Sequence, residues 1–368
     1  LTWETVITKN IGLDLGFLNN RLNVSFDAYI RDTKDMLMAG KTLPGVYGAS
    51  SPRMNVADLR TKGWEASITW GDSFTLASKP FNYRIMAGIG DNTSKVTKYD
   101  NPNRTLTDPY EGQQLGEIWG YVVDGYFTTD EEARNYKVDQ SFVNQMINAS
   151  ALDNGLHAGD LKFVDLDGNN KIEQTTSAND RKDMKVIGNS LPRYNYNFGI
   201  SADWYGIDFS VLFQGIGKQN WYPGAETSMF WGPYSRPYAS FIPSDFMSQV
   251  WSEENTDAYF PRPRGYVALG SNRELAVVNT KYLQNLAYCR LKNLSIGYTL
   301  PDKWLSKIGF EKIRVYFSGE NLLTFTKLHS DYIDPEQASA SNSWKTSKSD
   351  ANIYPWAKTY SFGVDITF

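Results

Sequence analysis

The sequence predicts an all-β protein: a transmembrane antiparallel β-barrel, present as a C-terminal portion of about nine strands of a larger barrel, with long extracellular loops. The last residues alternate from Tyr360 to Phe368, with large apolar side chains on one face and small, mostly polar ones on the other. This period of two is typical of a strand. The same period recurs along the chain, and the connections between the periodic stretches alternate between short and long. Outward apolar faces, inward polar faces and unequal loops at the two ends are typical of an outer-membrane barrel.

The predicted strands come mostly as hairpins. The dipeptides Asn19-Asn20 and Tyr205-Gly206 are good turn formers between alternating runs. The predicted strands are 10–17, 21–31, 63–70, 81–90, 194–204, 207–214, 288–300, 312–320 and 360–368.

The predicted connections differ in length in strict alternation. The short ones are Asn19-Asn20, 71–80, Tyr205-Gly206 and 301–311, and the long ones are 32–60, 91–193, 217–281 and 322–355. Within 91–193, residues 118–127 resemble a strand, and a capping box at Thr129 predicts a helix to about Ala149. Two packed sheets of a soluble sandwich, the alternative fold, need no such rule for the connections.

The strand count predicts that the chain is part of a larger barrel. A single-chain bacterial barrel has an even number of strands and both ends in the periplasm. About nine strands is an odd number, and counting back from the last strand would place Leu1 on the outside. We therefore expect residues 1–368 to be the C-terminal part of a barrel, with 91–193 and 217–281 as long extracellular loops.

Composition narrows the function. A net charge of −4 argues against a nucleic-acid partner, and no apolar run is long enough for a membrane-spanning helix. The aromatic share of 14 % suits girdles at both membrane interfaces, and hence contact with outer-membrane lipid. The single cysteine, Cys289, cannot form an internal disulfide.

One motif predicts a metal site. In DLDGNNKIE, the spacing of Asp165, Asp167 and Asn169, followed by the carbonyl of Lys171, matches a calcium loop, since calcium prefers many oxygen ligands. Asn170 stands at the usual glycine position, and the usual acidic twelfth position is Thr176. Asp180 would replace it if the intervening residues bulge outward. The alternative is a turn rich in Asp and Asn that binds no metal.

An aromatic cluster in 217–281 is a second candidate site. Its side chains are Trp221, Tyr222, Phe230, Trp231, Tyr234, Tyr238 and Phe241. Flat rings of this kind stack on sugars, so Trp221, Tyr222, Trp231 and Tyr234 are predicted substrate-binding residues. The alternatives are packing within the loop or against a partner protein.

No catalytic residues are predicted, so the protein is not expected to be an enzyme. The two histidines are His157 and His329, and His329-Ser330-Asp331 are consecutive, which does not suit a triad. The sequence contains no nucleophile elbow, zinc-protease motif or P-loop. A barrel-resident enzyme and a soluble adhesive sandwich are the alternative classes.

Several stretches together resemble the C-terminal half of the SusC/RagA family of TonB-dependent outer-membrane transporters. They follow the family order over nearly the whole chain: LTWETVITKNIGLDLGFLNNRLNVSFDAYIRDTKDML, TKGWEAS, GDLKFVDLDGNNKIE, DRKDMKVIG, YGIDFSVLFQGIG, YCRLKNLSIGYTLP, VYFSGENLLTFTK and KTYSFGVDITF. The acidic loop departs from the family pattern, because Asn169 and Asn170 replace Asp and Gly and residues are inserted before Asp180.

The resemblance implies a plugged barrel of about 22 strands in the outer membrane. It implies TonB-dependent import of oligosaccharides, or alternatively of oligopeptides. The implied partners are a SusD-like lipoprotein lid on the outer loops and TonB, which would act through an N-terminal region absent from this sequence.

Overall fold

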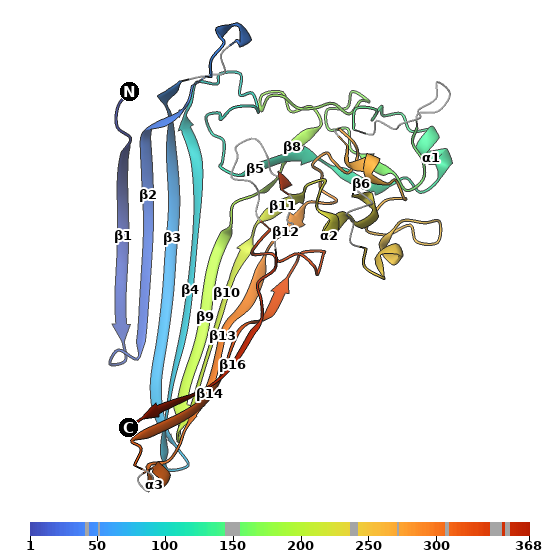
Figure 1. The fold of residues 1–368 in the computed structure, drawn as a ribbon. Coiled ribbons are helices and arrows are strands. Elements are labelled where there is room, and N and C mark those ends of the chain that lie inside the picture. Colours follow the sequence, from blue (N-terminus) through green and yellow to red (C-terminus); the bar gives the residue numbers. More distant parts are fainter. Residues whose placement is uncertain are drawn as a thin grey trace.

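Nine long strands form one antiparallel sheet in a computed structural model of the chain (Figure 1). The structure describes residues 1–40, 44–50, 52–143, 155–235, 242–270, 272–305, 309–338, 348–349 and 354–368. The strands, in sheet order, are β1 (Thr5–Phe17), β2 (Leu22–Ala39), β3 (Arg53–Leu76), β4 (Lys79–Lys98), β9 (Arg193–Trp204), β10 (Ile207–Lys218), β13 (Tyr288–Thr299), β14 (Lys312–Thr326) and β16 (Thr359–Thr367). All nine predicted strands are confirmed. Among the helices in the described part of the chain, none has the length and apolar character needed to cross a membrane.

Tight turns close the hairpins at one end of the sheet. Ala77 and Ser78, and likewise Tyr205 and Gly206, have positive φ angles, as the two central residues of a type I′ hairpin turn require. The predicted connection 71–80 is therefore wrong in extent, since β3 and β4 pair as far as Leu76 and Lys79. Between β13 and β14 the connection contains α3 (Asp302–Leu305).

At the opposite end, β2, β3 and β4 are much longer than predicted. The predicted loop 32–60 is mostly strand, because β2 continues to Ala39 and β3 begins at Arg53. Register shifts on either side of Met36, and a positive φ at Asp35, interrupt the alternation there. Because these irregularities break the alternation of apolar and polar side chains, the sequence pattern does not reveal that the strand continues.

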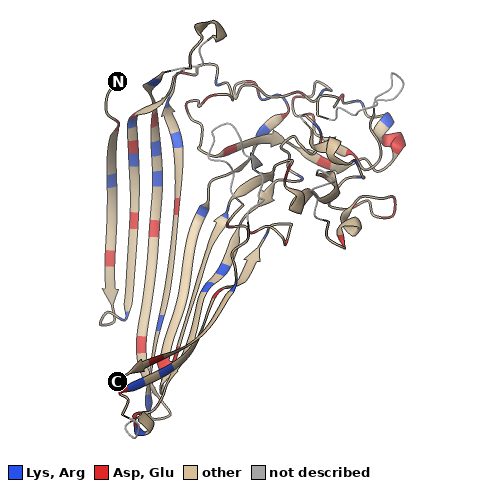
Figure 2. Ribbon diagram, viewed as in Figure 1, with Lys and Arg blue, Asp and Glu red and all other residues tan. Residues whose placement is uncertain are grey.

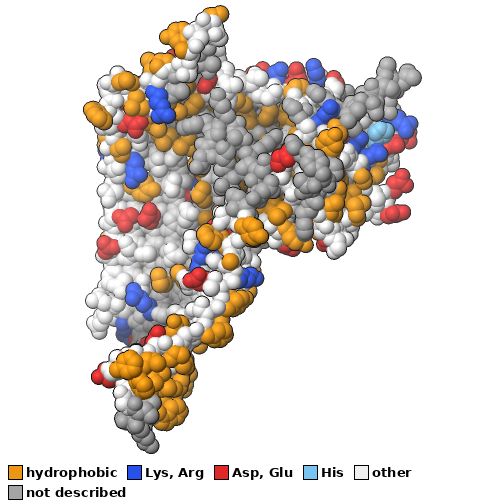
Figure 3. Space-filling model, in the orientation of Figure 1, with side chains coloured by type: hydrophobic (Ala, Val, Ile, Leu, Met, Phe, Trp, Pro, Cys, Tyr) orange, Lys and Arg blue, Asp and Glu red, His pale blue; other side chains and the backbone are white. Residues whose placement is uncertain are grey.

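The two faces of the sheet differ in chemistry. On β1 to β4 the outward side chains fall into three registered apolar rows, which we call the apolar band. These rows are Leu13, Phe26, Ala66 and Ile89; Leu15, Val24, Ile68 and Ala87; and Phe17, Leu22, Trp70 and Ile85. In Figure 3 the hollow face of the sheet carries scattered charged side chains and few hydrophobic ones, while hydrophobic side chains gather along the lower edge over the C-terminal strands.

Charged side chains bound the apolar band at both ends. Below it, Asp72 pairs with Arg21 at 3.1 Å, and above it Lys9 and Lys62 lie in one register with Ile30. The ten residue steps from Lys62 to Asp72 correspond to about 33 Å of strand and, at a tilt of about 40°, to about 25 Å of height. This height matches the apolar band of an outer-membrane barrel.

The long connections pack together beyond the upper end of the sheet (Figure 1). Side chains from 99–192, 219–287 and 327–338 share one hydrophobic core, and we call this assembly the loop body. Its strands are β5 (Glu117–Tyr121), β6 (Val123–Tyr126), β7 (Leu161–Phe163), β8 (Met184–Asn189), β11 (Asn220–Pro223) and β12 (Gln284–Asn285), and β15 (Lys348–Ser349) pairs with β11. The short helices are α1 (Asp130–Arg134), α2 (Ser228–Trp231), η2 (Gly232–Tyr234), η3 (Phe246–Gln249) and η4 (Tyr266–Leu269), while η1 (Gly45–Tyr47) lies in the β2–β3 connection. β5 and β6 confirm the strand predicted at 118–127.

The helix predicted from Thr129 to about Ala149 is wrong in extent. Thr129 caps α1 as expected, because its side chain accepts a hydrogen bond from the Glu132 N–H, but the helix ends after Arg134. Farther on, the backbone of Asp139 pairs with the 170–172 segment, and this tertiary pairing replaces helical hydrogen bonds. Residues 144–149 lie outside the described residues.

Candidate functional site

The polar face of the sheet contains a hollow of about 370 Å³ between β2, β3, β4 and β9. A hollow of this volume is within the range of pockets for small ligands. Its polar lining comes chiefly from Ser25, Asp27, Glu65, Ser67, Asn195 and Asn197. The wall therefore offers carboxylate, hydroxyl and amide groups that donate and accept hydrogen bonds.

Two acidic side chains in this hollow oppose each other directly. Asp27 and Glu65 are cross-strand partners in the register of β2 and β3. Like charges placed directly opposite disfavour strand pairing, so this arrangement is not explained by stability alone. It provides acceptors for hydroxyl or ammonium donors of a ligand.

Glycines keep the polar face open for larger neighbours. A Cβ atom at Gly63 would lie 2.4 Å from the ring of Tyr29, its cross-strand partner. A Cβ atom at Gly363 would lie 2.3 Å from the ring of Tyr316. The predicted small inward residues therefore have a packing role, since each accommodates the ring of a neighbouring strand.

A charge cluster occupies the polar face near the tight turns. Arg314 on β14 contacts Asp208 on β10 at 2.6 Å and Asp365 on β16 at 3.2 Å. A Cβ atom at Gly297, on the strand between β10 and β14, would lie 2.5 Å from the guanidinium of Arg314. The cluster ties the last strands of the sheet together on the face opposite the apolar side chains.

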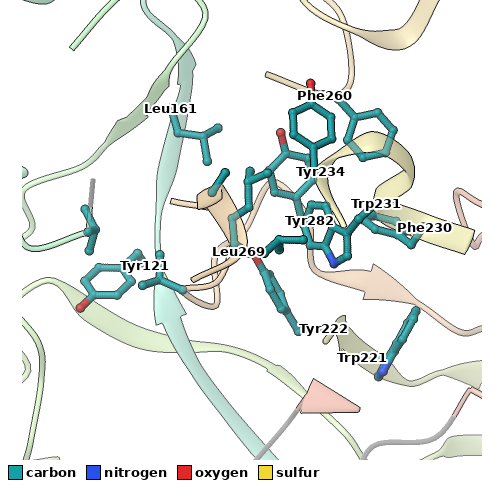
Figure 4. Packing of buried hydrophobic residues seen from close by; sticks show 14 of the residues in the cluster. Tyr121, Leu161, Trp221, Tyr222, Phe230, Trp231, Tyr234, Phe260, Leu269 and Tyr282 are labelled. Atoms are coloured by element: carbon teal, nitrogen blue, oxygen red, sulfur yellow. The ribbon is translucent and has the colours of Figure 1, made fainter. Parts of the chain in front are cut away.

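The aromatic cluster is the core of the loop body and does not form a binding surface (Figure 4). Trp221, Tyr222 and Trp231 are 0 % exposed and Tyr234 is 2 % exposed. The prediction that these four rings stack on a substrate is therefore wrong for this structure, because no ring face is accessible. The alternative of packing within the loop is confirmed; Tyr238 and Phe241 lie outside the described residues.

The polar atoms of these rings are satisfied within the loop body. The Tyr222 hydroxyl donates to the carbonyl of Leu275 at 2.8 Å, and the Trp231 indole N–H donates to the carbonyl of Gly224 at 2.9 Å. Tyr234 donates to the carbonyl of Pro261 at 2.6 Å. Each ring thus links the backbone of one segment to another, as buried Tyr and Trp side chains commonly do.

A buried acidic pair joins two of the long loops. Asp160 accepts hydrogen bonds from the guanidinium of Arg264 and from the His157 N–H at 2.9 Å. Glu274 lies 3.8 Å from Arg264, and its Oε1 has no hydrogen-bond partner among the described residues. Burial, reinforced by the charge of Asp160, raises the pKa of Glu274 to about 8. Asp160 is equally buried, but the guanidinium of Arg264 and the His157 N–H stabilise its charged form, so Asp160 carries the negative charge and Glu274 holds a proton at neutral pH.

The predicted metal loop brings three carboxylates together, but with a different third residue. Single carboxylate oxygens of Asp165, Asp167 and Asp183 lie within 4.8 Å of one another. Asp183 is buried, and burial together with the charges of Asp167 and Asp165 raises its pKa. Asp180 lies outside this cluster, in a turn where its N–H donates to the carbonyl of Ser177, and Asp183 occupies the place that the sequence suggested for Asp180.

Short hydrogen bonds hold the acidic loop in a tight turn. The N–H groups of Gly168 and Asn170 donate to Asp165, both at 2.7 Å, and Asn170, at the usual glycine position, has a positive φ. Although burial opposes it, these donors hold the pKa of Asp165 below its ordinary value. Asn169 turns its side-chain oxygen onto the Lys171 N–H at 2.8 Å, so Asn169 and the Lys171 carbonyl remain proposed ligands that would need a small rearrangement.

A buried ion network joins the segment 327–338, the third segment of the loop body, to the sheet. Arg290 on β13 contacts both Asp334 and Glu336 at 2.6 Å, and Arg290 is 2 % exposed. Lys292 contacts Glu336 at 2.8 Å, and the Trp356 N–H donates to Asp334. Linear spacing could not predict this network or Asp183, because the partners are joined only when distant loops close.

Comparison with known proteins adds a family relationship. The sequence profile of the TonB dependent receptor-like β-barrel family matches residues 1–322. The TonB-dependent receptor P3 of Formosa agariphila is 28 % identical over all of this chain, which spans 34 % of that protein. The TonB-dependent receptor SusC of Bacteroides thetaiotaomicron is 24 % identical, and this chain spans 32 % of it.

Solved structures show the same fold. The RagAB peptide importer in its open-open state matches the whole chain with a TM-score of 0.70 at 22 % identity, and the match covers 35 % of that chain. Its closed-closed state gives a TM-score of 0.69 at 23 % identity over 36 % of that chain. The chain thus spans about a third of the length of the relatives it matches.

Proposed function

The chain belongs to the TonB-dependent receptor-like β-barrel family, and on this premise we propose that it forms the C-terminal wall and outer loops of a TonB-dependent importer of oligosaccharides. A barrel of this family is an outer-membrane structure, so the apolar band faces lipid and the polar face lines the passage. The observation that carries the proposal is the polar hollow, whose Asp, Asn and Ser side chains match the hydroxyl groups of a sugar.

Uptake of labelled ligands tests this function. Cells that carry the full-length receptor are expected to take up a labelled oligosaccharide only when TonB is present. Replacement of Asn197 by Leu in the hollow should reduce uptake while leaving the amount of folded barrel unchanged. TonB-independent uptake, or uptake unaffected by Asn197→Leu together with Ser67→Leu, would contradict the proposal.

Oligopeptide import is the second candidate, because RagAB, one of the structural neighbours, is a peptide importer. The opposed carboxylates of Asp27 and Glu65 would accept the ammonium groups of a peptide as readily as sugar hydroxyls. Competition between an unlabelled cationic peptide and the labelled oligosaccharide distinguishes the two. Uptake of the peptide alone would assign the receptor to peptides.

We also propose that a surface lipoprotein of the SusD type covers the outer loops. Exposed apolar side chains support this, among them Met247 at 63 % and Tyr266 at 59 % exposure on the loop body. Co-purification of the lipoprotein with the full-length receptor should be lost in a Met247→Glu, Tyr266→Glu variant. Retention of the lipoprotein by this variant would place the contact elsewhere.

The acidic loop supports a further proposal, that calcium stiffens the loop body. Asp165, Asp167 and Asp183 would supply carboxylate oxygens, a donor chemistry that suits a hard cation. Calcium should protect residues 155–193 of the parent from protease, and Asp165→Ala with Asp167→Ala should abolish this protection. Asp180→Ala is the matched control and should retain it. A parent whose cleavage never responds to calcium would contradict the metal site.

A further inference from the structure

A group of basic side chains lies on the outward face of β1 to β4, separated from the apolar band by the single row of Ile11, Ala28 and Trp64. Figure 2 shows basic segments on these neighbouring strands in the upper half of the sheet. Lys9 and Lys62 occupy one register, and Arg60 and Lys95 occupy the next register above it. All four side chains are exposed. We call these four residues the outer cationic patch.

The patch has an excess of positive charge. Among the described residues, the only salt bridge within it joins Arg60 to Asp32 at 2.6 Å. Lys9, Lys62 and Lys95 have no such acidic partner in the described part of the chain. Arg60 and three lysines against a single aspartate leave a local net charge of +3.

The spacing suits a compact anion. Lys9 and Lys62 lie two strands apart, on either side of Ile30, which corresponds to about 10 Å between Cα atoms. Flexible lysine side chains can reach a common group over this distance. Arg60 lies one row higher on the same strand as Lys62, about 7 Å along it. Its Nε and Nη2 bind Asp32, so it offers the same group only its remaining Nη1 donors and its charge.

We propose that the outer cationic patch binds the phosphate groups of lipid headgroups in the outer leaflet. The patch lies one row above the apolar band, on the face that contacts lipid, and it is on the side of the long loops. A lipid whose acyl chains pack on the rows of Leu13, Phe26 and Ala66 would place its headgroup at the height of Lys9 and Lys62. The inference rests on the proposed membrane placement and is independent of the imported cargo.

The test compares lipid binding by the full-length receptor in detergent, measured by native mass spectrometry. The probes are bis-phosphorylated lipid A and the same lipid with its phosphates removed. Each cation near an anionic lipid surface contributes a factor of roughly five in affinity. Replacing Lys9 and Lys62 by Gln should therefore weaken binding of the phosphorylated lipid roughly 20- to 30-fold and leave binding of the phosphate-free lipid unchanged. Asp32→Asn, which removes the one acid, should strengthen binding of the phosphorylated lipid.

Matched controls separate this inference from folding and from transport. Arg84→Gln removes an exposed cation from the polar face of β4 and should not change lipid binding. Gel mobility with and without heating reports whether each variant is a folded barrel. Equal binding of both lipids by the parent, or an equal loss in the Arg84 variant, would overturn the proposal. So would displacement of the lipid by millimolar inorganic phosphate alone, since the site would then be one for free phosphate. Failure of oligosaccharide uptake would not bear on this result, because the patch faces away from the passage.

Discussion

Replacement of Glu274 by Gln should make the loop body more stable at neutral pH and remove part of its pH dependence. The carboxyl group is buried beside Asp160, shares Arg264 with it, and leaves one oxygen without a donor. Gln has the shape of the protonated acid and carries no charge at any pH. The substitution therefore keeps the packing of the folded state and removes a group that prefers to ionise when the loop body opens.

The sign and size of the effect follow from the two pKa values. In the open form a glutamate ionises near pH 4.3, whereas burial raises the pKa of Glu274 to about 8 in the folded form. Between these values the folded form holds a proton that the open form has lost, so the free energy of opening falls as pH rises. At about 1.4 kcal/mol per pH unit, the cost is roughly 3.5–4 kcal/mol at pH 7 and is absent below about pH 4.

Amide hydrogen exchange of the full-length receptor, compared between parent and variant at each pH, measures this cost. Exchange in 155–164 and 272–282 should be roughly 500-fold slower in Glu274→Gln at pH 7, and the difference should narrow tenfold for each pH unit toward pH 5. Glu253→Gln, which removes an exposed carboxylate from the same assembly, is the control and should match the parent. Parallel pH profiles for the parent and Glu274→Gln would show that Glu274 does not bind the proton and would refute the reasoning.

Three further substitutions test the packing. Gly63→Ala should lower the free energy of barrel unfolding by about 1–3 kcal/mol because its Cβ would meet the ring of the facing tyrosine, while Gly71→Ala, with its nearest atom at 3.7 Å, should cost far less; urea unfolding measures both. Arg290→Met should leave Asp334 as an unpaired buried charge, cost about 3–5 kcal/mol and expose 327–338 to protease. Trp231→Ala should destabilise the loop body by about 3–5 kcal/mol, seen as faster hydrogen exchange throughout it, while the strands keep their protection.

Different results for these three substitutions would contradict the packing roles given to Gly63, Arg290 and Trp231. Equal destabilisation at positions 63 and 71 would mean that loss of a strand glycine matters and the tyrosine ring does not. An unchanged protease pattern in Arg290→Met would mean that other contacts hold residues 327–338 against the sheet. Loss of sugar uptake in Trp231→Ala without faster exchange would restore the substrate-binding interpretation of that ring.

The strands could be predicted because their side chains must alternate between an apolar face toward lipid and a polar face toward the interior, which gives the sequence a period of two. Tyr360 to Phe368 and the hairpin at Tyr205-Gly206 carry this signal almost without interruption. Above the apolar band the side chains no longer face the apolar interior of the membrane, so the alternation weakens, and the strand continuations there were predicted as the loop 32–60. Asp32 and Arg60 form an outward ion pair on strands that continue past the membrane, and the bulge beside Met36 breaks the period.

The loop body could not be predicted to the same depth because no period applies to it. The rings of Trp231 and Tyr234 are as suitable for sugar stacking as for a core, and only the closure of three loops shows that they are buried. Asp183 replaces Asp180 for the same reason, since its carboxylate is brought to Asp165 by backbone hydrogen bonds from Leu166 and Glu173. The signal that could have helped is the strand-forming stretch at Met184–Asn189, which places Asp183 at its entrance.

The sheet and the loop body are therefore stabilised in different surroundings, lipid for the sheet and water for the loop body. Mutations in one should have little effect on the stability of the other. The strands satisfy their backbone groups in a continuous ladder and rely on lipid to cover their apolar face. The loop body has only short ladders, so it must bury its own apolar side chains away from water, as a small domain does. In the proposed complex with a lid protein, this packed core would keep the contact surface of the loop body in place. Damage to its core should consequently impair capture at the outer surface before it affects insertion of the barrel.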